Sequence, residues 1–155
     1  FSLVTDDSLL LEVELPDEWD DLNVSGITID SDTGETTPAI QASTDLDGFR
    51  DGYSTSGAEI VLYGGTTFDD IASVYESQCQ SAEPESEVTT GDGVTGQFVL
   101  FSQCTGNDGV ESEGFAYVSS FDLDNGDTLA ISVIIDAEAD FEALNTILET
   151  IVVDV

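Results

Sequence analysis

The sequence predicts an α+β fold in which helices pack against one antiparallel β-sheet. Three strand-like segments follow one another near the C-terminus with turn-forming stretches between them, so we expect them to form an antiparallel meander. Segments with apolar residues at helical spacing lie before and after this meander. No internal repeat or domain boundary interrupts the chain, so we expect residues 1–155 to form a single domain.

The N-terminal segment predicts a β-hairpin. Residues 9–15 alternate between two faces, and turn-forming residues precede them, so residues 2–5 are expected to be the first arm. Pro16 ends the second arm. Trp19 is the only tryptophan, and we expect it to pack on the end of the core. The alternative is a solvent-facing Trp19 that binds a partner.

The middle of the chain predicts three more strands. Residues 27–29 and 39–42 are short apolar segments on either side of a polar loop at 30–37. Residues 58–63 alternate, with Ile60 and Leu62 on one face, and the glycine pair that follows ends this strand.

Three helices are expected, at residues 45–53, 68–78 and 140–151. Each begins at a residue suited to cap a helix N-terminus: Thr44 or Asp45, Thr66 or Thr67, and Asp140. Residues 81–92 are polar and contain proline and glycine, so we expect an exposed loop there.

The predicted meander comprises strands at residues 96–104, 114–121 and 128–136. Asn125-Gly126 between the last two predicts a type I′ hairpin turn, because both residues adopt positive φ angles readily. A polar, glycine-containing stretch forms the preceding reversal.

Charge is the dominant feature of the composition. There are 34 Asp and Glu residues against one Arg, with no Lys and no His, giving a formal net charge of −33. Nucleic acids and anionic membranes are excluded as partners, because phosphate contacts depend on Lys and Arg. Self-repulsion destabilises a compact fold unless salt shortens its range, which is about 8 Å at physiological ionic strength and about 3 Å at 1 M. We therefore expect adaptation to high salt or divalent cations; the alternative is acidity that serves solubility alone.

Cysteine content indicates the compartment. Cys79 and Cys104 are the only two cysteines, and an even pair outside the cytosol usually forms a disulfide. The expected location is therefore extracellular or at the cell surface. The chain starts at Phe1 without a leader sequence, which suggests a processed product. The alternative is two free thiols in the cytosol of a salt-accumulating microbe.

Catalysis is disfavoured by residue content. Without His or Lys, a serine nucleophile lacks its usual general base. A carboxylate pair of the glycosidase kind remains, but among 34 acidic residues some pair falls at any distance by chance. Arg50, the one basic side chain, is expected to pair with a nearby carboxylate such as Asp47 or Asp51.

Calcium is the cofactor that the acidic loops suggest, because it prefers carboxylate and carbonyl oxygens. Two clusters lie in predicted loops: Asp30, Asp32 and Glu35, and Asp122, Asp124 and Asp127. Neither matches an EF-hand, and the alternative for each is an ordinary solvated turn.

Several short motifs together resemble a known family. They are the strand ending at Pro16 with Trp19 three residues later, the segment 42–49 (ASTDLDGF), Cys79 after a helix, Cys104 followed by Gly106, and the closing segment 147–153. This combination resembles an extracytoplasmic accessory domain of actinobacterial secreted proteins that often lies beside protease or protein-kinase modules. It is more distantly similar to the PsbP-like α/β sandwich of photosystem II extrinsic subunits. The resemblance implies that Cys79 and Cys104 pair, and it carries no catalytic residue.

The leading functional hypothesis is a non-catalytic secreted or cell-surface accessory domain that binds an extracellular protein or surface component. We expect an exposed binding patch near Trp19, Phe49 and Tyr53. The alternative is a structural subunit of an extracellular filament or surface layer, in which cations bridge the carboxylates of a homo-oligomer. Residues 2–5 or 151–155 would then add to a neighbour's sheet edge.

Overall fold

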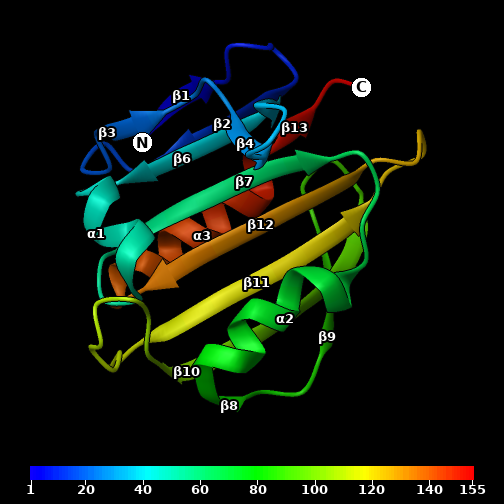
Figure 1. Cartoon of the computed structure of the whole chain (residues 1–155). Helices are drawn as coiled ribbons and strands as arrows, with labels where there is room; N and C mark the ends of the chain where they lie inside the picture. Colours follow the sequence, from blue (N-terminus) through cyan, green and yellow to red (C-terminus); the bar gives the residue numbers. More distant parts are fainter.

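The computed structural model describes all residues, 1–155, and has the predicted α+β fold, with thirteen strands and three helices. All the strand pairs are antiparallel (Figure 1). The helices are α1 (Leu46–Asp51), α2 (Phe68–Gln78) and α3 (Ala139–Thr150). The strands are β1 (Ser2–Thr5), β2 (Leu11–Leu15), β3 (Asp21–Asn23), β4 (Ile27–Asp30), β5 (Glu35–Thr37), β6 (Ala39–Ser43), β7 (Gly57–Tyr63), β8 (Cys79–Ala82), β9 (Ser86–Thr89), β10 (Thr95–Cys104), β11 (Phe115–Asp122), β12 (Thr128–Ile135) and β13 (Val152–Val153).

An eight-stranded sheet forms the centre of the molecule. Its strand order is β3-β6-β7-β12-β11-β10-β8, and β9 also pairs with β10. The predicted meander is confirmed as β10, β11 and β12, which pair in sequence order. Strands β7 and β12 lie at the middle of the sheet and hydrogen-bond to a neighbour on each side. Two smaller sheets, β1-β2-β13 and β4-β5, complete the fold.

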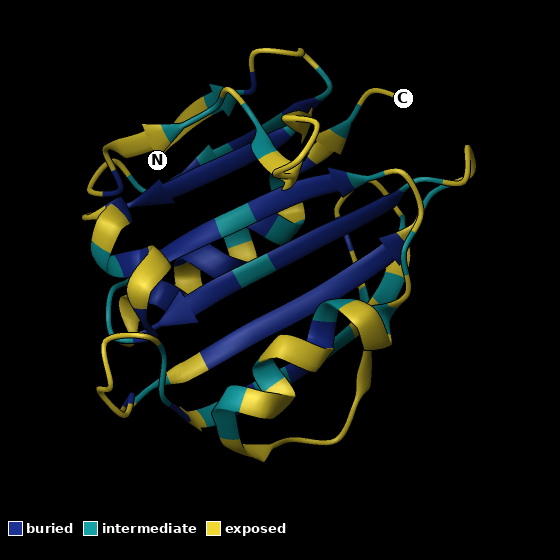
Figure 2. Ribbon diagram, in the orientation of Figure 1, coloured by how far each residue is buried: buried dark blue, intermediate teal, exposed yellow.

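One face of the large sheet carries the larger hydrophobic core. Helix α3 and strand β2 cover it, and the core contains Ile60 of β7, Ile131 of β12 and Ile147 of α3, all fully buried. Trp19 is buried in the same core, as the sequence predicts. Figure 2 shows that the central strands are buried along most of their length.

The opposite face is only partly covered. Helix α2 packs on β10 and β11, where Ala72 of the helix joins Val99, Phe101 and Val118 in a second core. The short helix α1 packs on β6, and a Cβ atom at Gly57 would lie 2.7 Å from the Phe49 ring. Neither helix covers the parts of β7 and β12 that carry Glu59, Tyr63 and Ser132.

Four local predictions are wrong. The predicted loop at 30–37 ends in strand β5 (Glu35–Thr37), which pairs with β4. Residues 81–92 contain the end of β8 and the whole of β9. Both strands pair with β10 and their side chains are mostly exposed, so their polar composition resembles that of a loop. Only Gly126 has a positive φ (92°) in the turn before β12, and its N–H donates to Leu123 O. The turn is therefore not type I′, which would require positive φ at Asn125 as well. Glu138, not Asp140, occupies the N-cap of α3.

The remaining helix predictions are confirmed with small shifts. Thr67 caps α2, since its Oγ1 accepts the N–H of Asp70 at 3.2 Å. Asp45 occupies the N-cap of α1, but the carboxylate that accepts the Leu46 N–H is that of Asp21. No helix combines the length and apolar character needed to cross a membrane.

Candidate functional site

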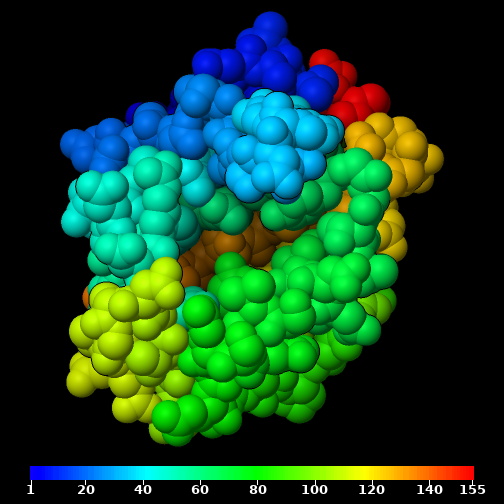
Figure 3. All heavy atoms as spheres, in the orientation of Figure 1, coloured from blue at the N-terminus to red at the C-terminus, as the bar shows by residue number.

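A groove opens on the partly covered face of the sheet. Its volume is about 590 Å³; β7 and β12 form its floor, and α1, α2 and the loop between β10 and β11 form its walls. Figure 3 shows the hollow, in which the orange-brown atoms of β12 are visible between the cyan wall of α1 and the green wall of α2. Its volume and its mixed polar and aromatic lining make it the candidate site.

A polar row crosses the floor of the groove. Glu59 of β7 lies opposite Gln41 of β6 on one side and Ser132 of β12 on the other. Residues paired in this way project from the same face of a sheet. The row becomes apolar at the next two strands, where Val118 and Val99 pair under α2. The change from polar to apolar therefore marks where helical cover begins.

Arg50 stands at the edge of the groove and has no carboxylate partner. Its Nη2 donates to Gln41 Oε1 at 2.6 Å, and the only ion pair of the chain joins the N-terminal ammonium to Asp17. The expected pairing of Arg50 with Asp47 or Asp51 is therefore wrong. The neutral Gln41 amide accepts from one donor of the guanidinium, which makes no direct ion pair.

Gln41 links Arg50 to the polar row. Its Oε1 accepts from Asn23 Nδ2 at 3.0 Å as well as from Arg50, and its Nε2 donates to Glu59 Oε2 at 2.6 Å. Gln41 itself is buried, so both of its neighbours in the groove are held in place by a fixed amide. A guanidinium and a carboxylate thus lie in one groove, separated by one side-chain amide.

Three tyrosines line the groove. The Tyr53 and Tyr75 rings meet edge to face with centroids 6.1 Å apart, and Tyr75 stacks on Phe101 at 5.7 Å. Burial raises the pKa of Tyr75, and burial together with the Glu59 charge raises the pKa of Tyr63. Neutral phenols therefore present aromatic faces to a ligand over the ordinary pH range.

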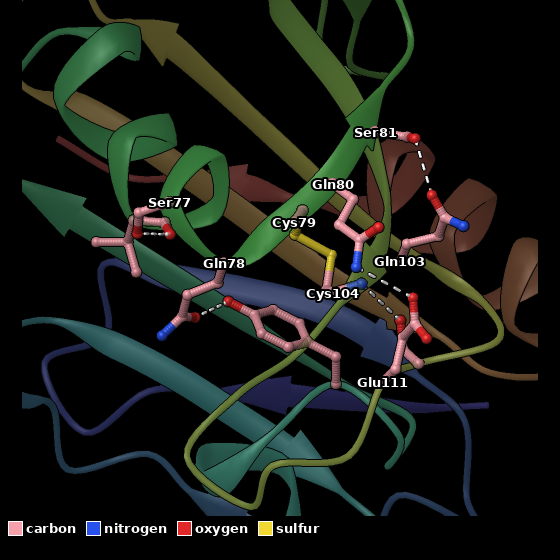
Figure 4. The surroundings of a disulfide bond; sticks show 11 residues. Ser77, Gln78, Cys79, Gln80, Ser81, Gln103, Cys104 and Glu111 are labelled. Atoms are coloured by element: carbon pink, nitrogen blue, oxygen red, sulfur yellow. Dashed lines mark hydrogen bonds between the residues drawn. A yellow bond between two sulfur atoms is a disulfide. The ribbon is translucent and has the colours of Figure 1, made fainter.

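A disulfide fixes one end of the α2 wall. Cys79 follows α2 directly and lies opposite Cys104 at the end of β10, and the two form the predicted bond (Figure 4). No free cysteine remains, so the alternative of two free thiols does not hold. Gln78, next to the disulfide, accepts the Tyr53 hydroxyl at its Oε1, and its backbone oxygen accepts the Thr105 N–H at 2.9 Å. This wall is thereby connected to both the segment after α1 and the β10–β11 loop.

The β10–β11 loop closes the end of the groove against α1. Asp108 N–H donates to Asp51 O at 3.0 Å. Gly106 lies so close to α1 that a Cβ atom there would fall 2.6 Å from Gly52 Cα. Only glycine permits this approach, which makes the end wall a fixed boundary.

The predicted exposed patch at Trp19, Phe49 and Tyr53 is wrong. All three side chains are buried, at 4%, 9% and 8% exposure. They also fall in different cores, since Trp19 packs on the α3 side of the sheet and the other two pack on the α2 side. Aromatic side chains of this size stabilise the fold most when they are buried, and these three are packed in the two hydrophobic cores. Phe49 and Tyr53 nevertheless contribute to the rim of the groove.

The predicted metal loops form hydrogen-bonded turns. In the β4–β5 hairpin, Asp30 Oδ1 accepts the Asp32 N–H at 2.9 Å, and Glu35 pairs with Asp30 in the ladder. In the β11–β12 turn, Asp127 bonds with Asn125 through both its carboxylate and its N–H.

The remaining members of the second cluster, Asp122 and Asp124, are exposed. No group of three or more His, Cys, Asp or Glu side chains anywhere in the chain is arranged to hold a metal ion. Calcium binding by these loops stays a prediction.

The sequence interpretation missed the groove residues Glu59, Tyr63, Tyr75 and Ser132. A usable indication was present, because Glu59 and Ser132 are polar residues near the middle of otherwise apolar strands. Polar residues at such positions are unfavourable unless the face they occupy is hydrogen-bonded or open to solvent.

No family model matches the chain, and no curated protein matches it either.

Proposed function

We propose that this chain is a secreted, salt-adapted, non-catalytic domain that binds an extracellular component in the groove. The observation that carries the proposal is the groove itself, with about 590 Å³ of space over the polar row of β7 and β12. This volume lies within the range of about 300–1,000 Å³ that is typical of ligand sites.

The lining suits recognition of a ligand. Tyr63 and Tyr75 supply aromatic faces, while Ser132 and Gln78 supply hydrogen-bonding groups. Ligand sites typically combine an apolar surface with a few polar groups that fix orientation. The walls are joined to one another by a disulfide and by backbone hydrogen bonds, which favours a preformed site.

Residue content supports a non-catalytic role. Ser132 is a potential nucleophile on the floor, and its neighbour in the ladder is Glu59 rather than a histidine. Nucleophilic catalysis by serine depends on a base that withdraws its proton, and a carboxylate is a poor base for that purpose at neutral pH.

The charge and the disulfide support a saline exterior. The chain carries −33, and Arg50 neutralises none of it by direct pairing. A structural disulfide persists in oxidising compartments. The resemblance to actinobacterial extracytoplasmic accessory domains agrees with this location.

NMR spectroscopy of the isotope-labelled domain at about 1 M salt tests the proposal. We expect a set of small aromatic and polar compounds to shift resonances of the groove residues selectively. Ser132→Trp should abolish these shifts by filling the floor, whereas Asn145→Trp on the exposed surface of α3 should leave them unchanged. Shifts scattered over the surface, or identical in both variants, would contradict the proposal. Turnover of a substrate that Glu59→Gln abolishes would contradict its non-catalytic part.

One observation favours the structural-subunit alternative. Strand β1 is an edge strand, and its Leu3 side chain is 60% exposed. An open edge with an apolar residue is a template for a strand of another copy. Light scattering against calcium concentration separates the two functions: growth of assemblies that a chelator reverses would favour the subunit, and an unchanged monomer would favour the binding domain.

A further inference from the structure

We infer that the groove ligand is a small organic acid whose carboxylate pairs with Arg50. The inference rests on the proposed function and names its ligand class. Its basis is the state of Arg50, the one basic side chain of the protein, which lines the groove without an ionic partner.

The contacts of Arg50 prepare it for an anion. A guanidinium has five N–H donors in a planar fork, and the Arg50 side chain makes one hydrogen bond, to Gln41. The amide of Gln41 is itself fixed by Asn23 and Glu59. The guanidinium is therefore oriented by a neutral group, and its remaining donors match the two oxygens of a carboxylate.

The acidic surface does not oppose this pairing in salt. Asp51, Glu59 and Asp70 also line the groove and repel a ligand carboxylate, but repulsion beyond about 3 Å is screened at 1 M salt. A contact at hydrogen-bond distance persists under the same conditions. High salt, which screens repulsion within the acidic chain, thus also permits an anionic ligand to bind next to Arg50.

The ligand body is expected to be aromatic or aliphatic and small. Val61, Ile71, Val74 and Tyr75 provide apolar surface along the groove. The floor strands β7 and β12 are both paired on either side, so an extended peptide has no free strand edge with which to hydrogen-bond. These features favour a compact molecule over a peptide.

Matched probes test the inference. Phenylacetate and naphthylacetate are titrated into the labelled domain beside their amides and the corresponding arylethylamines, which share the ring system and differ in charge. We expect each acid to bind at least about tenfold more tightly than its amide, a difference of about 1.4 kcal/mol. Arg50→Gln should lower the affinity for each acid to about that of its amide in the same variant, and Arg50→Lys should retain part of the preference. Arg50 is exposed, and the urea midpoint of each variant checks that the fold is kept.

Salt gives a second readout. The preference for the acid should increase between about 0.1 M and about 1 M sodium chloride, because distant repulsion is screened while the direct pair remains. Amides that bind as tightly as acids, amines that bind best, or an acid preference that survives in Arg50→Gln would overturn the inference and leave the proposed function standing. Failure of every probe to shift any groove resonance would overturn both.

Discussion

Ser56 and Asp140, 84 positions apart in the sequence, are joined by a hydrogen bond of 2.6 Å from the serine hydroxyl to Asp140 Oδ2. The same oxygen accepts the N–H groups of Asp136 and Ala137 at 2.9 Å each. One buried carboxylate thus ties the segment before β7 to the entry into α3.

Replacement of the Asp140 carboxylate should lower the stability of the fold. Asp140→Ala leaves three donors without their acceptor, and we expect the free energy of unfolding to fall by about 3 kcal/mol. Urea unfolding at high salt measures the loss. Asp92→Ala, which removes an exposed carboxylate without side-chain hydrogen bonds, serves as the matched control, and an equal effect in both variants would contradict a specific role for Asp140.

Loss of the disulfide should destabilise the chain and loosen the groove wall. The bond closes a loop across a sequence separation of 25 residues, for which loop-closure entropy predicts about 3 kcal/mol. We expect the double variant Cys79→Ser and Cys104→Ser to lose about this amount in urea unfolding. Hydrogen exchange should also quicken at the C-terminal end of α2, while β7 and β12 change little. Uniform acceleration across the sheet would argue against a local role in the wall.

Tyr117→Phe should stabilise the protein. The Tyr117 hydroxyl is buried and has no hydrogen-bond partner, so its removal relieves a desolvation cost of about 1 kcal/mol. Tyr53→Phe is the opposite case, because the Tyr53 hydroxyl donates to Gln78 and its loss leaves an acceptor unpaired. We expect the two variants to shift the urea midpoint in opposite directions. Destabilisation by Tyr117→Phe would indicate a partner for this hydroxyl, such as water.

The buried tyrosines should make stability fall at alkaline pH. Burial raises the pKa of Tyr117 to about 12 and raises that of Tyr75 as well. A folded-state pKa above the unfolded value of about 10 means that the stabilisation is complete below pH 10 and is lost as pH rises toward the folded-state pKa. Urea midpoints should therefore decline from about pH 10 upward, and the decline should be shallower in Tyr117→Phe. A flat profile to pH 12 would contradict this expectation.

Local sequence patterns were sufficient to predict those elements that pair with their neighbours in the sequence. The strands of the meander β10–β11–β12 are consecutive in the sequence, so strand-like segments and the turn residues between them are enough to predict it. Helical spacing of apolar residues predicted that Cys79 lies at the end of α2. The presence of only two cysteines predicted its bond to Cys104.

The groove arises from pairings that no local pattern contains. Strand β7 lies between β6 and β12, and β12 follows it by more than 60 residues in the sequence. The alternation of β7 shows that Glu59 and Ile60 face opposite ways, but not which face a helix will cover. That depends on the length of α2 and on the anchoring of its end by Cys79, which are properties of the assembled sheet.

Salt should stabilise this protein over the whole range in which it screens charge. The chain holds one ion pair, at the exposed N-terminus, so screening removes almost no attraction while it weakens the repulsion among 34 acidic residues. We expect the urea midpoint to rise steadily from about 0.1 M to about 1 M sodium chloride. Neutralisation of three exposed carboxylates, in Glu76→Gln, Glu113→Gln and Asp154→Asn combined, should raise stability at low salt and have little effect at high salt, because repulsion is the quantity that both treatments reduce. A midpoint that falls with salt, or a variant with equal gains at both salt levels, would show that charge repulsion does not limit the stability of the fold.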